Sequence, residues 1–196
     1  MRKSVSFLFF LISCMLTAQQ SELIPLNEGW QFAQADKATH SNESGSTFRQ
    51  WYAAEVPGSV QRDLIRHGVL PDPYYGTNEK QVQWVEDENW DFKKSFTVTA
   101  DQLKYDEAVI FFEGLDTHAD VFLNGARILQ TNNMFTGHKI PVKNVLVEGE
   151  NRLYIRFYSP IQRMMPARAT FGYDYPAGND HREEKLSIYN RKAPYH

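Results

Sequence analysis

Apolar and polar residues alternate along much of the chain between residues 92 and 158, and a period of two predicts β-strands. The segment Arg152–Tyr158 is the clearest case, because Leu153, Ile155 and Phe157 occupy every second position. Alternate residues of a strand share one face of the sheet. We therefore expect these three side chains to be buried and the intervening arginines to point outward.

A hairpin is predicted at Asn124-Gly125, because both residues tolerate the positive φ angles that a tight type I′ turn requires. Pairing across a two-residue turn predicts two cross-strand pairs on one apolar face, Leu123 with Ala126 and Val121 with Ile128.

The amino-terminal half of the mature chain is less regular. A first strand is expected at residues 30–32, where Trp30 and Phe32 alternate with a polar residue. Ser59 is a suitable helix cap, and a short helix that carries Leu64 should follow it and stop at Gly68.

Residues 159–196 contain several prolines and mixed charges with little periodicity, so this stretch is expected to be a connection outside the core. The strands and turns together predict an all-β fold, an antiparallel β-sandwich of jelly-roll type with one short helix and an irregular carboxyl-terminal tail. The predicted boundaries are residues 19–165 for the sandwich and 166–196 for the connecting segment.

Residues 1–18 have the pattern of a secretory signal peptide: Arg2 and Lys3, then an apolar stretch, then the small residue Ala18. The apolar stretch is too short to span a bilayer, so no transmembrane segment is expected in the mature chain. We expect export to the periplasm or the exterior. Leu11-Ile12-Ser13-Cys14 also resembles a bacterial lipobox, so a lipid anchor at Cys14, the only cysteine, is the alternative to simple cleavage.

The net charge of -3 provides no basic field for a phosphate backbone, so nucleic acid is not an expected partner. Aromatic residues make up 14% of the chain, which suits either a sandwich core or surfaces that stack on sugar rings. Composition does not separate these two uses.

Few residues show a pattern typical of catalysis or of cofactor binding. The six histidines are scattered without the spacing of metal ligands, and no glycine-rich phosphate loop is present, so neither a metal nor a cofactor is expected. The acidic clusters Glu86-Asp87-Glu88 and Glu183-Glu184 each lie on one segment. Neighbouring acids seldom face each other across a bound sugar, so both are interpreted as solvated loops.

Two groups of residues are candidates for sugar contacts. Trp84, Trp90, Tyr74 and Tyr75 could stack on a pyranose ring, although we favour the interpretation that they cover the core. In the tail, Asn179, Arg182 and Arg191 can bond sugar hydroxyls and are the predicted substrate-binding residues; a plain surface linker is the alternative.

Four segments resemble glycoside hydrolase family 2. GLDTHADVFLNG, residues 114–125, is similar to the signature of its sugar-binding domain, and ENRLYIRFYSP, residues 150–160, is similar to the next characteristic segment. VPGSVQRDLIRHGVLPDPYYGTNE, residues 56–79, and VQWVEDENWDFKKSF, residues 82–96, resemble the β-mannosidase branch of the family.

The resemblance implies a jelly-roll sugar-binding domain, followed by an immunoglobulin-like sandwich and a (β/α)₈ barrel that holds both catalytic glutamates. It implies a retaining, cofactor-free, exo-acting enzyme that removes terminal β-linked mannose. The expected partners are a mannose-containing oligosaccharide or glycoside and the protein's own carboxyl-terminal domains.

In β-mannosidases a Trp-Asp-Trp-Gly segment that reaches the active site follows soon after an Arg-Lys pair such as residues 191–192. The 196 residues end before such a segment and contain no catalytic residue that the resemblance identifies, so we expect this stretch alone to be inactive. A free-standing carbohydrate-binding module and a purely structural sandwich are the alternative interpretations.

Overall fold

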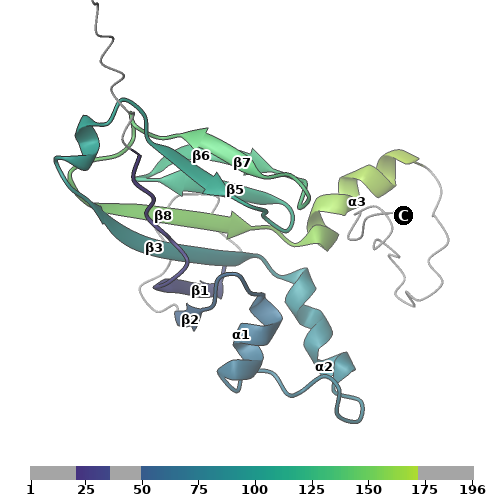
Figure 1. Cartoon of the computed structure of the whole chain (residues 1–196). Helices are drawn as coiled ribbons and strands as arrows, with labels where there is room; N and C mark the ends of the chain where they lie inside the picture. Colours follow the sequence, from purple (N-terminus) through teal and green to yellow (C-terminus); the bar gives the residue numbers. More distant parts are fainter. Residues whose placement is uncertain (1–20, 36–49, 172–196) are drawn as a thin grey trace, which may run out of the picture.

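The computed structural model describes residues 21–35 and 50–171, which form two antiparallel sheets packed against each other (Figure 1). The larger sheet has the strand order β2-β1-β3-β8-β5-β6, and β4 pairs with β7 in the smaller one. The strands are β1 Trp30–Gln34, β2 Tyr52–Ala54, β3 Trp90–Val98, β4 Val109–Phe112, β5 Ala119–Leu123, β6 Ala126–Thr131, β7 His138–Pro141 and β8 Gly149–Phe157. The helices are α1 Val60–Arg66, α2 Glu79–Val82 and α3 Pro160–Phe171, with 3₁₀ turns η1 Gln83–Asp87 and η2 Gln102–Lys104.

The core lies on one face of the larger sheet and has two parts. The smaller sheet covers the first, whose buried members are Trp30, Ile110, Leu115, Ala119, Val121, Leu123, Val142, Leu153 and Ile155. The segment that carries α1 and η1 covers the second, whose buried members are Phe32, Leu64, Leu70, Val85 and Trp90. Apolar faces turned toward each other define a β-sandwich, and the predicted all-β fold is confirmed.

Strand β8 follows the predicted alternation only in part. Leu153 and Ile155 are buried and Arg152 is exposed, as expected. The prediction that Arg156 points to solvent is wrong, because only 5% of it is exposed. Asp91 on β3 lies beside Arg156 in the register and supplies a buried carboxylate as its partner.

The hairpin turn is confirmed, since Asn124 and Gly125 have φ angles of 50° and 82°. The predicted pairing holds only next to the turn. A register shift between Val121 and Phe122 places Val121 opposite Leu129 instead of Ile128. The four residues therefore do not share one buried face, and Ala126 is exposed.

The helices confirm one prediction and contradict another. Helix α1 begins after Ser59, whose side chain accepts a hydrogen bond from the Arg62 backbone N–H, and Gly68 follows it with a φ of 68°. Helix α3 occupies residues that were predicted to be irregular. Its first residue is Pro160, a position where proline is compatible with a helix because the N–H it lacks has no partner in the first turn.

Candidate functional site

The predicted substrate-binding residues Asn179, Arg182 and Arg191 lie outside the described residues. The described part of the chain that leads toward them is the junction between β8 and α3, which leaves the larger sheet at one end of β8 (Figure 1). The bonds that hold this junction therefore fix the start of α3.

Ser159 joins α3 to the loop around η1. Its backbone N–H donates to Asn89 Oδ1 at 2.7 Å, and its hydroxyl donates to the Glu86 carbonyl oxygen at 2.7 Å. The same hydroxyl oxygen accepts from the Gln162 backbone N–H at 3.2 Å and so caps the helix. The Gln162 side chain donates to the Asp87 carbonyl oxygen at 2.8 Å. Ser159 is only 1% exposed, so these contacts anchor the first turn of α3.

A buried ion pair lies on the face of the larger sheet that is opposite to the core. Arg156 Nε donates to Asp91 Oδ1 at 2.7 Å, and Arg156 Nη2 donates to Asp91 Oδ2 at 2.8 Å and to the Tyr154 hydroxyl at 3.0 Å. The hydrogen bonds with Asp91 raise the pKa of Arg156 above its ordinary value. Burial and the nearby Asp91 carboxylate raise the pKa of Tyr154. Arg156 therefore stays charged and Tyr154 stays neutral at physiological pH.

A second polar group extends this arrangement to α3. The Tyr158 hydroxyl donates to Asp120 Oδ2 at 2.7 Å, and Gln130 Nε2 donates to Asp120 Oδ1 at 2.9 Å. The Arg163 guanidinium lies 3.8 Å from the centre of the Tyr158 ring, a cation–π geometry that holds α3 against the end of β8. Burial and the hydrogen bond to Asp120 raise the pKa of Tyr158.

These side chains are suited to positioning and not to proton transfer. A guanidinium with a raised pKa keeps its charge, and a tyrosine with a raised pKa releases its proton only in strong base. We define the β8–α3 anchor as Asp91, Asp120, Arg156, Tyr158 and Ser159. Its bonds hold the start of α3 against the end of β8 and the loop around η1.

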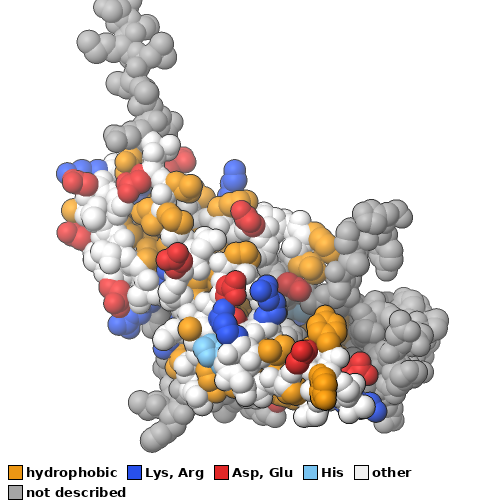
Figure 2. Space-filling view, turned by 60° about the horizontal axis from the view of Figure 1, so that its bottom comes forward, with side chains coloured by type: hydrophobic (Ala, Val, Ile, Leu, Met, Phe, Trp, Pro, Cys, Tyr) orange, Lys and Arg blue, Asp and Glu red, His pale blue; other side chains and the backbone are white. Residues whose placement is uncertain are grey.

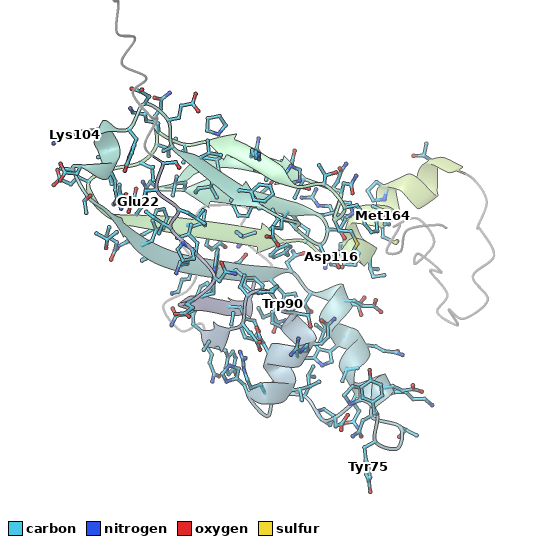
Figure 3. The ribbon with its side chains drawn as sticks, in the orientation of Figure 1. Glu22, Tyr75, Trp90, Lys104, Asp116 and Met164 are labelled. Carbon is cyan, nitrogen blue, oxygen red and sulfur yellow. The ribbon has the colours of Figure 1, made fainter. Side chains whose placement is uncertain are left out.

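The four aromatic candidates differ widely in how much of each side chain is exposed. Trp90 is 6% exposed and donates through Nε1 to the Val85 carbonyl oxygen, so the core interpretation is confirmed for it. Trp84 is 37% exposed and lies 5.9 Å from Trp90 between ring centroids. The core interpretation is wrong for Tyr74 and Tyr75, which are 97% and 78% exposed. The label in Figure 3 places Tyr75 at the tip of the loop between α1 and α2. The type of a residue does not indicate how much of its side chain is buried, so the sequence does not separate these four.

Within residues 21–35 and 50–171, no three or more His, Cys, Asp or Glu side chains come together as a metal site would require. None of the helices in that part of the chain is long and apolar enough to cross a bilayer.

Comparison with known proteins identifies the type of domain. The family model for the glycosyl hydrolase 2 galactose-binding domain-like region matches residues 30–196. Beta-mannosidase B of Thermothelomyces thermophilus is 40% identical over 141 residues, which are 72% of this chain and 15% of that protein. Beta-mannosidase B of Emericella nidulans is 34% identical over 176 residues, 87% of this chain and 19% of that protein.

A solved structure is similar along most of the chain. The crystal structure of a beta-D-mannosidase from Dictyoglomus thermophilum superposes with a TM-score of 0.72 and 37% identity. The match covers 82% of this chain and 18% of that one. The chain thus spans less than a fifth of the length of these relatives.

Proposed function

Because this chain belongs to glycoside hydrolase family 2 through its galactose-binding-like domain, we propose that it is the amino-terminal domain of a retaining exo-β-mannosidase. The substrate would be a glycoside or oligosaccharide with a terminal, non-reducing β-D-mannose. The observation that carries this proposal is the similarity to proteins named beta-mannosidase, which extends over 72% to 87% of the chain.

In this proposal the catalytic acid and nucleophile come from segments beyond this domain, as the resemblance to the family implies. The domain itself would contribute hydrogen-bond donors to the mannose in the active site. Asn179, Arg182 and Arg191 are the proposed donors, because amide and guanidinium groups bond hydroxyl oxygens. The β8–α3 anchor supports this role, since it gives the preceding helix a fixed start.

The test compares two polypeptides on p-nitrophenyl β-D-mannoside. The 196-residue chain should release no p-nitrophenol above background. A polypeptide that carries this chain together with the remaining length found in its relatives should hydrolyse the mannoside in preference to the matching β-galactoside and β-glucoside. Turnover by the 196-residue chain would refute the assignment of catalysis to other segments. Failure of the longer polypeptide on the mannoside would leave the carbohydrate-binding module as the better interpretation.

Arg182→Ala in the longer polypeptide tests the proposed sugar contact. Loss of a charged hydrogen bond costs about 1.5–3 kcal/mol, so kcat/KM should fall roughly 10-fold to 150-fold. Arg152→Ala is the matched control, because Arg152 is exposed on β8 and pairs with Glu150 at the surface. Equal effects of the two substitutions would argue against a sugar contact by Arg182.

We also propose that the protein is exported, on the evidence of the charged and apolar pattern in residues 1–18. Amino-terminal sequencing of the mature protein tests this proposal. A start at Gln19 supports simple cleavage, a lipid-bearing start at Cys14 supports anchoring, and an intact Met1 would refute export.

A further inference from the structure

The loop between α1 and α2 presents two tyrosines to solvent. Tyr74 is 97% exposed and Tyr75 is 78% exposed, so most of each side chain faces solvent. Figure 3 shows Tyr75 directed away from the body of the protein at the loop tip. Tyrosines are usually at least partly buried, so it is unusual for two adjacent tyrosine rings to be exposed to water.

The loop that carries the tyrosines is held by its own hydrogen bonds. Asp72 Oδ1 accepts from the Tyr74 backbone N–H at 2.9 Å, and the Asp72 carbonyl oxygen accepts from Asn78 Nδ2 at 3.0 Å and from the Tyr75 N–H at 3.3 Å. The Asn78 N–H donates to the Tyr75 carbonyl oxygen at 3.2 Å. Gly76 adopts a φ of 61°, which glycine accepts without strain. A backbone held in this way would lose little conformational freedom when a ligand binds.

We propose that Tyr74 and Tyr75 form a contact site for the mannose units of the substrate, an inference that rests on the proposed function. The apolar face of a tyrosine ring fits the C–H face of a pyranose, and its hydroxyl can donate to or accept from a sugar hydroxyl. A site at the tip of a projecting loop is suited to units of an oligosaccharide next to the one being cleaved.

The surroundings of the two rings favour a sugar over a protein surface. The tyrosines are flanked in the sequence by the exposed polar residues Asp72, Thr77 and Glu79. Val69, which is 43% exposed, lies earlier in the same loop. Figure 2 shows hydrophobic side chains interspersed with white and charged atoms on the face that comes forward. A stable protein interface needs a larger continuous patch, whereas a sugar ring needs one aromatic face with polar groups beside it.

The test is a titration of the 196-residue chain with β-1,4-linked mannotetraose. The NMR signals of labelled tyrosine rings are recorded at each ligand concentration. The resonances of Tyr74 and Tyr75 should shift with added ligand. Tyr74→Ala and Tyr75→Ala should each weaken binding roughly twofold to tenfold, the range expected for loss of one aromatic contact. Tyr74→Phe should keep most of the affinity, because it keeps the ring. Phe111→Ala is the matched control, since Phe111 is a 53% exposed aromatic residue on β4, outside the loop.

Unshifted tyrosine resonances, or alanine variants that bind as tightly as the parent, would overturn the inference. A second result would also overturn it. If Tyr74→Ala lowered the melting temperature of the longer polypeptide but left its affinity for mannotetraose unchanged, the loop would contact protein instead of sugar. The proposed function fails separately: a longer polypeptide that binds mannotetraose through these tyrosines but does not hydrolyse β-mannosides would refute the enzyme assignment and leave the site in place.

Discussion

Asp91→Ala is the most direct test of the β8–α3 anchor. Asp91 is fully buried and Arg156 is 5% exposed, so the substitution removes the Asp91 carboxylate from a guanidinium that lies in the interior. Removing one member of a buried ion pair typically costs about 3–5 kcal/mol. The free energy of unfolding should fall by that amount.

A surface ion pair on the same strand provides the matched control. Arg152 Nε lies 2.9 Å from Glu150 Oε1, and the two side chains are 65% and 57% exposed. Exposed pairs contribute about 0.2–1 kcal/mol, so Glu150→Ala should change stability little. The comparison therefore sets a buried, bidentate ion pair against an exposed one on the same strand.

The double variant Asp91→Ala/Arg156→Met separates the pair from the space it occupies. With both charges removed, no desolvated guanidinium remains, and stability should recover by about 2 kcal/mol or more relative to Asp91→Ala. Urea unfolding of the 196-residue chain, followed through the fluorescence of the buried Trp30 and Trp90, measures all four proteins. The reasoning would be refuted if Asp91→Ala cost no more than Glu150→Ala, or if the double variant were no more stable than Asp91→Ala.

Three further substitutions test other parts of the structure. Gly125→Val places a β-branched residue at a φ of 82°, so urea unfolding should show a loss of about 1–3 kcal/mol, and an unchanged midpoint would contradict the turn geometry. Tyr158→Phe should make the free energy of unfolding less sensitive to pH above 10. The pKa of Tyr158 is raised in the folded protein above its unfolded value of 10.0. The stability that Tyr158 contributes is therefore complete below pH 10 and is lost as pH rises through the folded pKa. Parallel stability curves for this variant and its parent between pH 9 and about 12 would disprove that assignment. Ser159→Ala should cost about 1–2 kcal/mol and reduce the helical circular dichroism signal from α3, and a full helical signal at unchanged stability would show that the cap is dispensable.

Much of the domain could be predicted from local sequence because the features concerned depend on residues close together in the chain. The alternation in β8, the Ser59 cap of α1 and the positive φ angles at Asn124-Gly125 are of this kind. Each follows from backbone geometry and from hydrogen bonds within a few residues. The resemblance to family 2 added the sugar-binding domain type, which the comparisons confirm.

The candidate site was less accessible to sequence reasoning. Asn179, Arg182 and Arg191 stay predictions, because they lie outside the described residues. The β8–α3 anchor had no local signal, since Ser159 bonds Asn89 and Glu86 from a distant part of the chain. Helix α3 has no clear signal in the sequence, because proline usually argues against a helix. Pro160 occupies the first position, which a helix accepts, but Pro166 lies inside the helix.

Tertiary structure alone decided which polar and aromatic residues are buried. Alternation placed Arg156 on the outer face of β8, but its burial depends on Asp91, 65 positions away, which the antiparallel pairing of β3 with β8 sets beside it. The depth of Trp90 and the exposure of Tyr74 depend in the same way on what packs against each ring. A residue's chemistry is local, whereas its solvent exposure and its partner are set by chain segments that meet only when the sheet has formed.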